Sequence, residues 1–324
     1  MMSLLDEVFT VLVFPGFVFS VVMAFWFEYL ERKITARVQK RVGPLITGPR
    51  GLLQPFIDVV KLLCKEEIVP RGTDIFAFRI APVLAVTIPV FGMCFIPIIS
   101  WKTPLSFQAD FLLVFLLLAL SLLNVALTGY SVLSPYTSMG VGRLLVQYSM
   151  YEGIFLLSLI SAMIQTQTIS FEGILKYQSM KGPLILYQPI SFVCALLALL
   201  AKLEKRPFDL PHAKQEIVAG WETELSGRGL AFIRLYTDLS MVWGISLLVI
   251  VFLGGPLGPG FNSLMPVAGF TWFAIKALGL TILLTVISAS TGRIRVYGLA
   301  DIFWERLYPL LLVQLLISYF LRWL

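Results

Sequence analysis

The sequence predicts an all-α polytopic membrane protein with about eight transmembrane helices, and three observations support this fold class. Of its 324 residues, 58% are hydrophobic and 14% are charged, whereas a soluble domain is nearer half apolar and a quarter charged. The mean hydropathy is +0.88. Apolar segments also recur at the length of roughly 20 residues that a helix needs to cross about 30 Å of hydrocarbon. We therefore expect one integral membrane domain over residues 1–324.

The apolar segments define the expected spans. The first begins near residue 8 and is longer than a signal-peptide core, with no basic region before it and no small-residue cleavage site after it, so we expect a retained helix. The fourth is the least apolar. The expected spans lie near residues 8–29, 79–100, 110–129, 144–166, 184–202, 232–254, 266–290 and 304–323.

The distribution of basic residues predicts the orientation. The loops after the first, third, fifth and seventh spans carry 19 of the 25 lysines and arginines. Because basic loops stay on the cytoplasmic side, both termini are expected on the outer side of the cytoplasmic membrane. The net charge of +6 then reflects membrane orientation, and we expect no nucleic-acid partner.

Two of these loops have patterns of their own, at residues 30–79 and 202–231. In the first, the segment from Gly51 to Glu67 repeats apolar residues at helical spacing, with Asp58, Lys61 and Lys65 on the polar side. This pattern predicts an amphipathic helix that lies in the membrane interface or packs against a partner. The second loop mixes acids and bases, and it fits either a proton-holding cluster or a solvated surface.

The sequence offers no redox or nucleotide site. Cys64, Cys94 and Cys194 are far apart, and His212 is the only histidine. No metal-ligand spacing, haem-ligand pair or glycine-rich phosphate loop is present in the sequence. We expect no cofactor on this chain and no catalysis by it alone.

Four of the ionisable residues that fall within the expected spans call for an explanation. Glu152 and Lys276 fall inside the fourth and seventh spans, where an ionisable group marks an ion path or forms a structural pair. Arg234 and Asp238 lie four residues apart, so they share a helix face and are expected to neutralise each other.

The motifs of both loops, and of the spans between them, resemble one family along nearly the whole chain. The shared residues include Glu31-Arg32-Lys33, Gly51-Leu52-Leu53-Gln54-Pro55, Tyr151-Glu152, Pro207-Phe208-Asp209-Leu210-Pro211, Val218-Ala219-Gly220, Thr223-Glu224 and Trp304. They resemble the heel subunit of the respiratory complex I superfamily, which is called the H subunit in bacteria and NADH dehydrogenase subunit 1 in mitochondria.

The resemblance implies a role in coupling. Heel subunits join a peripheral redox arm to antiporter-like membrane subunits, and iron–sulfur clusters lie on an iron–sulfur small subunit and beside a hydrogenase-like large subunit. Carried over, the ion-coupling residues would be Glu152, Asp209, Glu216, Glu224 and Lys276. The residues that dock the peripheral arm would be Glu31, Arg32, Arg37, Arg41, Gln54, Asp58, Lys61, Arg293 and Arg295.

Departures from the family pattern favour one branch. Lys202, His212 and Lys214 stand where quinone-reducing relatives commonly have acids, Tyr297 where an aspartate is usual and Ser288 where an arginine is common. We therefore expect a ferredoxin-driven complex of the membrane-bound [NiFe] hydrogenase or sulfur reductase type, which couples electron transfer to H⁺ or Na⁺ translocation. The alternative is the quinone-site and proton-coupling subunit of complex I. A passive anchor and a freestanding transporter are the alternatives from another class.

Overall fold

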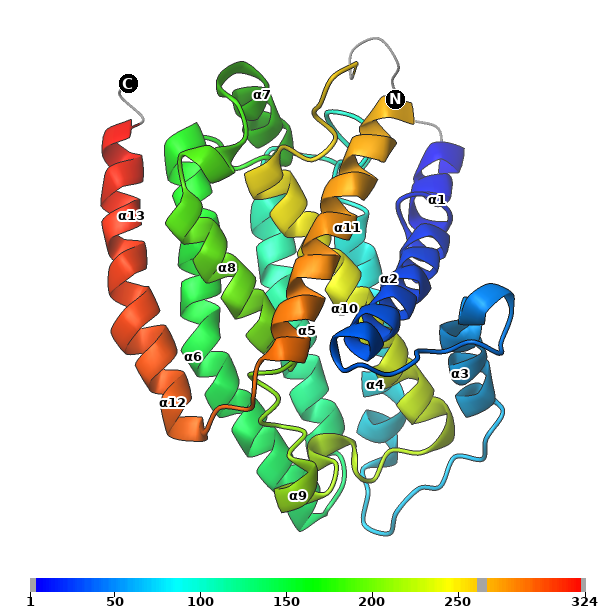
Figure 1. Cartoon of the computed structure of the whole chain (residues 1–324). Coiled ribbons are helices and arrows are strands. Elements are labelled where there is room, and N and C mark those ends of the chain that lie inside the picture. Colours follow the sequence, from blue (N-terminus) through cyan, green and yellow to red (C-terminus); the bar gives the residue numbers. More distant parts are fainter. Residues whose placement is uncertain (1–3, 261–266, 322–324) are drawn as a thin grey trace.

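A computed structural model describes residues 4–260 and 267–321, and every regular element in these ranges is a helix (Figure 1). This confirms the all-α fold class. The helices are α1 (Leu4–Leu12), α2 (Phe17–Val38), α3 (Gln54–Leu63), α4 (Ile75–Met93), α5 (Asp110–Tyr130), α6 (Pro135–Thr166), α7 (Phe171–Lys181), α8 (Pro189–Lys202), α9 (Lys214–Ile217), α10 (Gly227–Leu253), α11 (Val267–Ser290), α12 (Val296–Ala300) and α13 (Tyr308–Leu321).

The long helices stand side by side as a bundle. Helix α1 begins and helix α13 ends at the same side of this bundle (Figure 1). We call the opposite side, which carries α9 and the segments 39–53, 203–226 and 291–295, the basic end. We call the side of α7 and the segment 94–109 the terminal end. Within the described ranges, six helical segments are long and apolar enough to span a membrane.

The two other expected spans are helical but shorter or interrupted. Helix α8 has 14 residues and follows the short turn at Leu184–Leu186. The last span is one continuous helical path in which the π-helical turn η4 (Asp301–Leu307) joins α12 to α13. A π-helical turn widens the helix locally, and such turns are frequent at functional sites.

The first expected span differs in both its middle and its end. It breaks between α1 and α2 at Pro15 and Gly16, because proline has no amide hydrogen to donate to the helix. Helix α2 then continues to Val38, nine residues past the expected end at residue 29. No helix breaker occurs before Gly43-Pro44, and Arg32 pairs with Glu28 one turn earlier on the same helix. Much of the expected loop at 30–79 is therefore helix.

The amphipathic helix expected in the first loop is confirmed as α3. It is shorter than expected, and it packs on α2 and α10. Val59 is buried, and the ring of Phe56 packs edge-on against Phe25 of α2. Lys61 is exposed, as the polar side of the pattern predicts.

Helix α10 forms the centre of the bundle. In its most apolar 18-residue stretch, 89% of the residues are buried, and the helix contacts α2, α3, α4 and α11. Its closest contact with α4 involves a glycine: a Cβ built on Gly92 would lie 2.4 Å from the indole ring of Trp243. Small residues allow such close approach between membrane helices.

A buried polar network joins α6, α8 and α13 toward the terminal end. The amide nitrogen of Gln188 donates to Gln165 Oε1 at 2.6 Å and to Ser318 Oγ at 3.0 Å, while Ser161 Oγ lies 2.8 Å from Ser191 Oγ. Gln188, Ser161 and Ser318 are fully buried. Hydrogen bonds between helices in an apolar environment hold membrane bundles together.

Candidate functional site

A cavity of about 560 Å³ opens at the basic end between α2, α10 and the segment that follows α8. Its lining is dominated by ionisable groups, so we call it the charged cavity. The lining residues are Glu28, Glu31, Arg32, Thr35, Arg41, Pro44, Leu203, Glu204, Lys205, His212, Glu222, Arg234, Thr237 and Asp238. Such a density of charge near membrane helices requires partners for most of the groups.

The wall on α2 is an ion-pair network that continues into α3. Arg32 binds Glu28 on its own helix, and its Nη1 lies 2.5 Å from Asp58 Oδ2 on α3. Gln54 Nε2 donates to the other Asp58 oxygen at 2.7 Å. Glu31 accepts a hydrogen bond from Lys205, in the segment after α8. We call the loop at residues 202–231, which follows the fifth expected span, the fifth loop. The network therefore fixes α3 and the fifth loop to the end of α2.

Four of the expected docking residues thus lie together: Glu31, Arg32, Gln54 and Asp58. The others are spread over the basic end. Arg37, Arg41 and Lys61 are exposed, and Arg293 and Arg295 follow α11 near the fifth loop.

The fifth loop contributes an ion pair around His212. Nε2 of His212 lies 2.7 Å from Oε2 of Glu204, and the same oxygen accepts a hydrogen bond of 3.2 Å from Nε1 of Trp221. Burial of the imidazole opposes its charge, but Glu204, with a smaller contribution from Glu222, outweighs burial and raises the pKa of His212 to about 9. His212 is therefore an imidazolium at neutral pH.

Trp221 is seated between two membrane helices. A Cβ on Gly140 of α6 would lie 2.4 Å from the Trp221 amide nitrogen, and one on Gly129 of α5 would lie 3.1 Å from the Trp221 Cβ. The turn that carries Trp221 begins at Gly220, which has φ of +65° and no space for a side chain beside Pro211 O. The two helix glycines and Gly220 therefore determine where Trp221, and with it Glu204, is held.

Arg234 pairs across the cavity rather than along its own helix. Its Nη2 lies 2.9 Å from Oε2 of Glu222, which is 6% exposed. The prediction that Arg234 pairs with Asp238 is therefore wrong, because the guanidinium of Arg234 forms its ion pair with the buried Glu222. Asp238 instead faces Glu28 of α2, with which it shares a side-chain hydrogen bond.

The acids of the fifth loop that the resemblance assigned to coupling lie outside the charged cavity. Asp209 Oδ1 lies 3.3 Å from Arg293 Nε, and Arg293 also donates to the backbone carbonyls of Asp209 and Leu210. Glu216 on α9 lies 2.5 Å from Arg143 at the start of α6. Glu224 is half-buried after the Trp221 turn. Asp209 and Glu216 therefore tie the loop to neighbouring helices.

Glu152 is a buried acid on α6, next to Tyr151. It is 6% exposed, and neither carboxylate oxygen has a hydrogen-bond partner within the described part of the chain. Tyr151, 1% exposed, also has an unpartnered hydroxyl there. Lys202 is the opposite charge that acts on Glu152, and its Nζ donates to Leu118 O at 2.9 Å. Buried groups without direct partners are sites for internal water.

Lys276 lies at the other end of the bundle. Its Nζ donates to Gly255 O at 2.9 Å and to Leu257 O at 2.7 Å, just after the end of α10. A cation at a helix C-terminus is favoured by the helix dipole and by the free carbonyls there. This arrangement fits a structural role for Lys276, which is the alternative to a place in an ion path.

The sequence did not indicate Glu28, Glu204, Glu222 or Asp238 as members of one cavity. Glu28 carried a signal, since it lies four residues before Arg32. Glu204 and Glu222 belonged to the mixed acidic and basic loop at 202–231, but their individual partners, His212 and Arg234, follow only from the fold of that loop. Within the described ranges, no three cysteine, histidine or acidic residues lie close enough together to hold a metal ion.

Known proteins match this chain over nearly its whole length. The sequence model of the NADH dehydrogenase family matches residues 10–319. The H subunit of NADH-quinone oxidoreductase from Thermomicrobium roseum is 34% identical over 308 residues, which are 90% of this chain and 89% of that protein. The protein of the same name from Syntrophotalea carbinolica is 33% identical over 91% of this chain and 90% of its own.

A third relative, the H subunit numbered 2 of the same enzyme in Geobacter sulfurreducens, is 34% identical over 91% of both chains. These names favour the complex I alternative and give no support to the hydrogenase or sulfur reductase type that the departures at Lys202, His212 and Lys214 suggested. The chain is a membrane subunit of the complex I superfamily and belongs to the NADH dehydrogenase family.

Proposed function

We propose that this chain joins the electron-transfer arm of an NADH-quinone oxidoreductase to its ion-translocating membrane arm, and that it carries part of the path that couples the two. The relatives are named for NADH-quinone oxidoreduction, and the chain holds its ionisable groups at the basic end, where a redox partner would dock. The observation that carries the proposal is the charged cavity together with the buried Glu152, whose carboxylate has no hydrogen-bond partner within the described ranges.

We place the docking surface on the exposed part of the basic end. Arg37, Arg41 and Lys61 are exposed there, while the network of Arg32 with Asp58 keeps α2 and α3 at a fixed distance. A rigid surface loses little conformational entropy on binding. The proposed partners are an iron–sulfur small subunit and a large subunit of the redox arm, which hold the iron–sulfur clusters. Antiporter-like subunits would contact the lipid-embedded helices.

Coupling would run from the charged cavity to Glu152. Tyr151 supports this route because it adjoins Glu152 in α6 and interacts electrostatically with Glu204, which lines the cavity. A redox event at the docked partner changes the local field, and the ion pairs of the cavity wall and the buried Glu152 respond to that change. In this scheme Asp209 and Glu216 hold the loop in place, Glu224 lies beside it, and Lys276 fixes the end of α10.

The test uses the intact complex in sealed vesicles with NADH and a short-chain quinone. We expect Glu152→Gln to lower the number of ions translocated per electron, because the amide keeps the shape and removes the titrating group. Glu172→Gln is the matched control, since Glu172 lies on α7 and pairs with Lys176 at the terminal end. An unchanged ratio in Glu152→Gln would support a passive anchor. Hydrogen evolution without quinone reduction would overturn the proposed class of complex.

Orientation is tested separately. We propose that both termini lie outside the cytoplasmic membrane, because the basic residues gather at the end away from α1 and the last turn of α13. Alkaline phosphatase fused after α13 should be active, and fluorescent protein fused there should be dark. The opposite result would invert the topology.

A further inference from the structure

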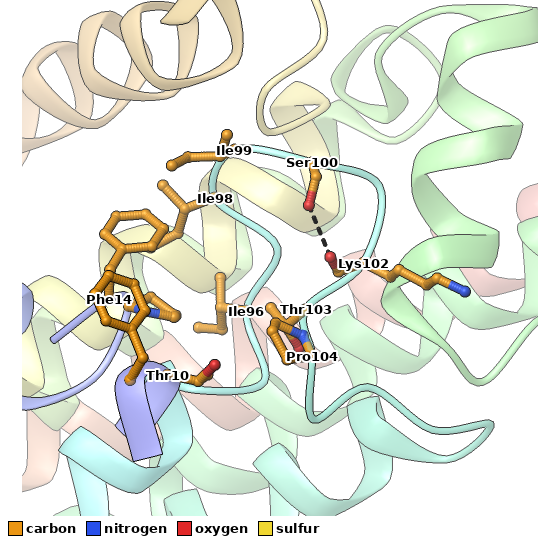
Figure 2. Close-up of a pocket in the computed structure, with 11 residues that line it drawn as sticks. Thr10, Phe14, Ile96, Ile98, Ile99, Ser100, Lys102, Thr103 and Pro104 are labelled. Carbon is orange, nitrogen blue, oxygen red and sulfur yellow. Dashed lines mark hydrogen bonds between the residues drawn. The ribbon is translucent and has the colours of Figure 1, made fainter. Parts of the chain in front are cut away.

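A second cavity, of about 410 Å³, lies at the terminal end between α1, the break before α2 and the segment that follows α4 (Figure 2). Its volume falls in the range of about 300 to 1,000 Å³ that small-molecule sites have. Its wall is mainly apolar and includes Phe9, Phe14, Ile96, Ile98, Ile99 and Pro104. It is separate from the charged cavity and shares no residue with it.

One polar group in this wall lacks a partner. Thr103 is 7% exposed, and its Oγ1 accepts and donates no hydrogen bond within the described part of the chain. A buried hydroxyl left unsatisfied costs free energy that a ligand acceptor recovers. Figure 2 shows Thr103 among the apolar residues of the wall, near Ile96. The site therefore presents an apolar volume with one hydrogen-bond donor.

The cavity borders the lipid-facing surface. Phe9 belongs to its wall and is also 55% exposed, on the face of α1 that exposes Val8 and Leu12. The span that contains α1 and α2 is the least buried of the candidate spans, with 28% of its apolar window buried. Hydrocarbon chains are the surroundings of such a face, so the cavity is continuous with lipid.

A tryptophan beside the cavity is consistent with a site near the boundary between acyl chains and headgroups. Trp101 lies next to the cavity residues, and tryptophan is enriched at this boundary. Lys102 does not complete a phosphate site, because its amino group extends away from the cavity (Figure 2) and interacts with Glu172 of α7. A neutral acceptor is therefore the better match to the Thr103 hydroxyl.

We propose that this cavity binds one acyl chain of a membrane phospholipid, and that the Thr103 hydroxyl donates a hydrogen bond to the ester carbonyl of that chain. The apolar wall excludes water from the chain, and the hydroxyl fixes its upper end. The lipid fills the space between α1 and the segment after α4, and so holds the N-terminal helix against the bundle. This site does not depend on the coupling function.

The test is photochemical labelling of the intact complex in phosphatidylcholine vesicles that contain a trace of phosphatidylcholine with a diazirine on one acyl chain. Peptide mapping should concentrate the label near Phe14 and Ile98. Thr103→Val keeps the shape and removes the donor, so we expect about three- to tenfold less label there, the factor that corresponds to one hydrogen bond. Ile98→Trp fills the cavity and should abolish the label.

Thr87→Val is the matched control, because Thr87 is an exposed threonine on the surface of α4. It should leave the label near Ile98 unchanged. Equal labelling in wild type, Thr103→Val and Thr87→Val would overturn the proposal. Crosslinks from these positions to another subunit, in place of lipid, would also overturn it and assign the cavity to a partner helix. Thr103→Val makes the test independent of whether Ile98→Trp folds.

Discussion

His212 Nε2 lies 2.7 Å from the carboxylate of Glu204, and this contact makes the chain's only histidine a permanent cation at neutral pH. Burial alone would favour the neutral imidazole, so the charge of Glu204 determines the protonation state. The resemblance led us to expect a departure from the family pattern at position 212. In the structure, the histidine at this position forms an ion pair with Glu204.

The pair predicts a pH dependence of stability. The pKa of His212 rises from its ordinary 6.5 to about 9 in the folded protein, so its contribution is fully present below about pH 6.5 and is lost as the pH rises through 9. At about 1.4 kcal/mol per pKa unit, the contribution is about 3 to 4 kcal/mol. Thermal unfolding of wild type and His212→Gln should differ at pH 6 and converge by pH 10. A difference that stays constant with pH would contradict this.

Arg32→Ala should destabilise the junction of α2 and α3. The substitution leaves Glu28 and Asp58 without their shared cation, and we expect a loss of about 1 to 3 kcal/mol. Arg37→Ala is the control on the same helix, because Arg37 is exposed and should change stability by less than about 0.5 kcal/mol. Equal effects of the two substitutions in chemical unfolding would show that the network contributes little.

Gly92→Ala should disturb the packing of α4 on α10. The added Cβ would lie 2.4 Å from the rigid ring of Trp243, and overpacking of this kind costs about 1 to 3 kcal/mol. Gly153→Ala is the control, since a Cβ at Gly153 on α6 meets no atom within 4 Å and alanine favours helix. Melting temperatures in detergent compare the two variants, and a neutral Gly92→Ala would mean that the helices can separate at this contact.

Lys276→Met separates a structural from a coupling role. Losing both hydrogen bonds to Gly255 and Leu257 should lower stability by about 1 to 3 kcal/mol. In the complex that still assembles, the number of ions translocated per electron should equal that of wild type. A lower number of ions translocated per electron, with unchanged assembly, would instead assign Lys276 a role in ion translocation.

The all-helical fold and the helix in the first loop followed from the sequence because burial in lipid imposes length and periodicity. Of the eight expected spans, six are long and apolar enough within the described ranges to cross a membrane, and the other two are shorter or interrupted. The break before Phe17 and the extension of α2 to Val38 were harder to predict. The break depends on Pro15. The length of α2 depends on the Glu28–Arg32 pair and on the position of the next helix breaker. The charged cavity was predicted only in part: Glu31 and Arg32 came from the resemblance. The contacts of Glu222 with Arg234 and of Glu204 with His212 arise from a loop path that carries no periodic signal.

The seat of Trp221 between Gly129 of α5 and Gly140 of α6 has a mechanical consequence. Gly140 and Gly129 lie against the backbone nitrogen and the Cβ of Trp221, so a side chain added at either glycine would displace the whole residue. The indole nitrogen donates to the same Glu204 oxygen that holds His212. The spacing of α5 and α6 therefore sets the position of the residue that bonds directly to this ion pair.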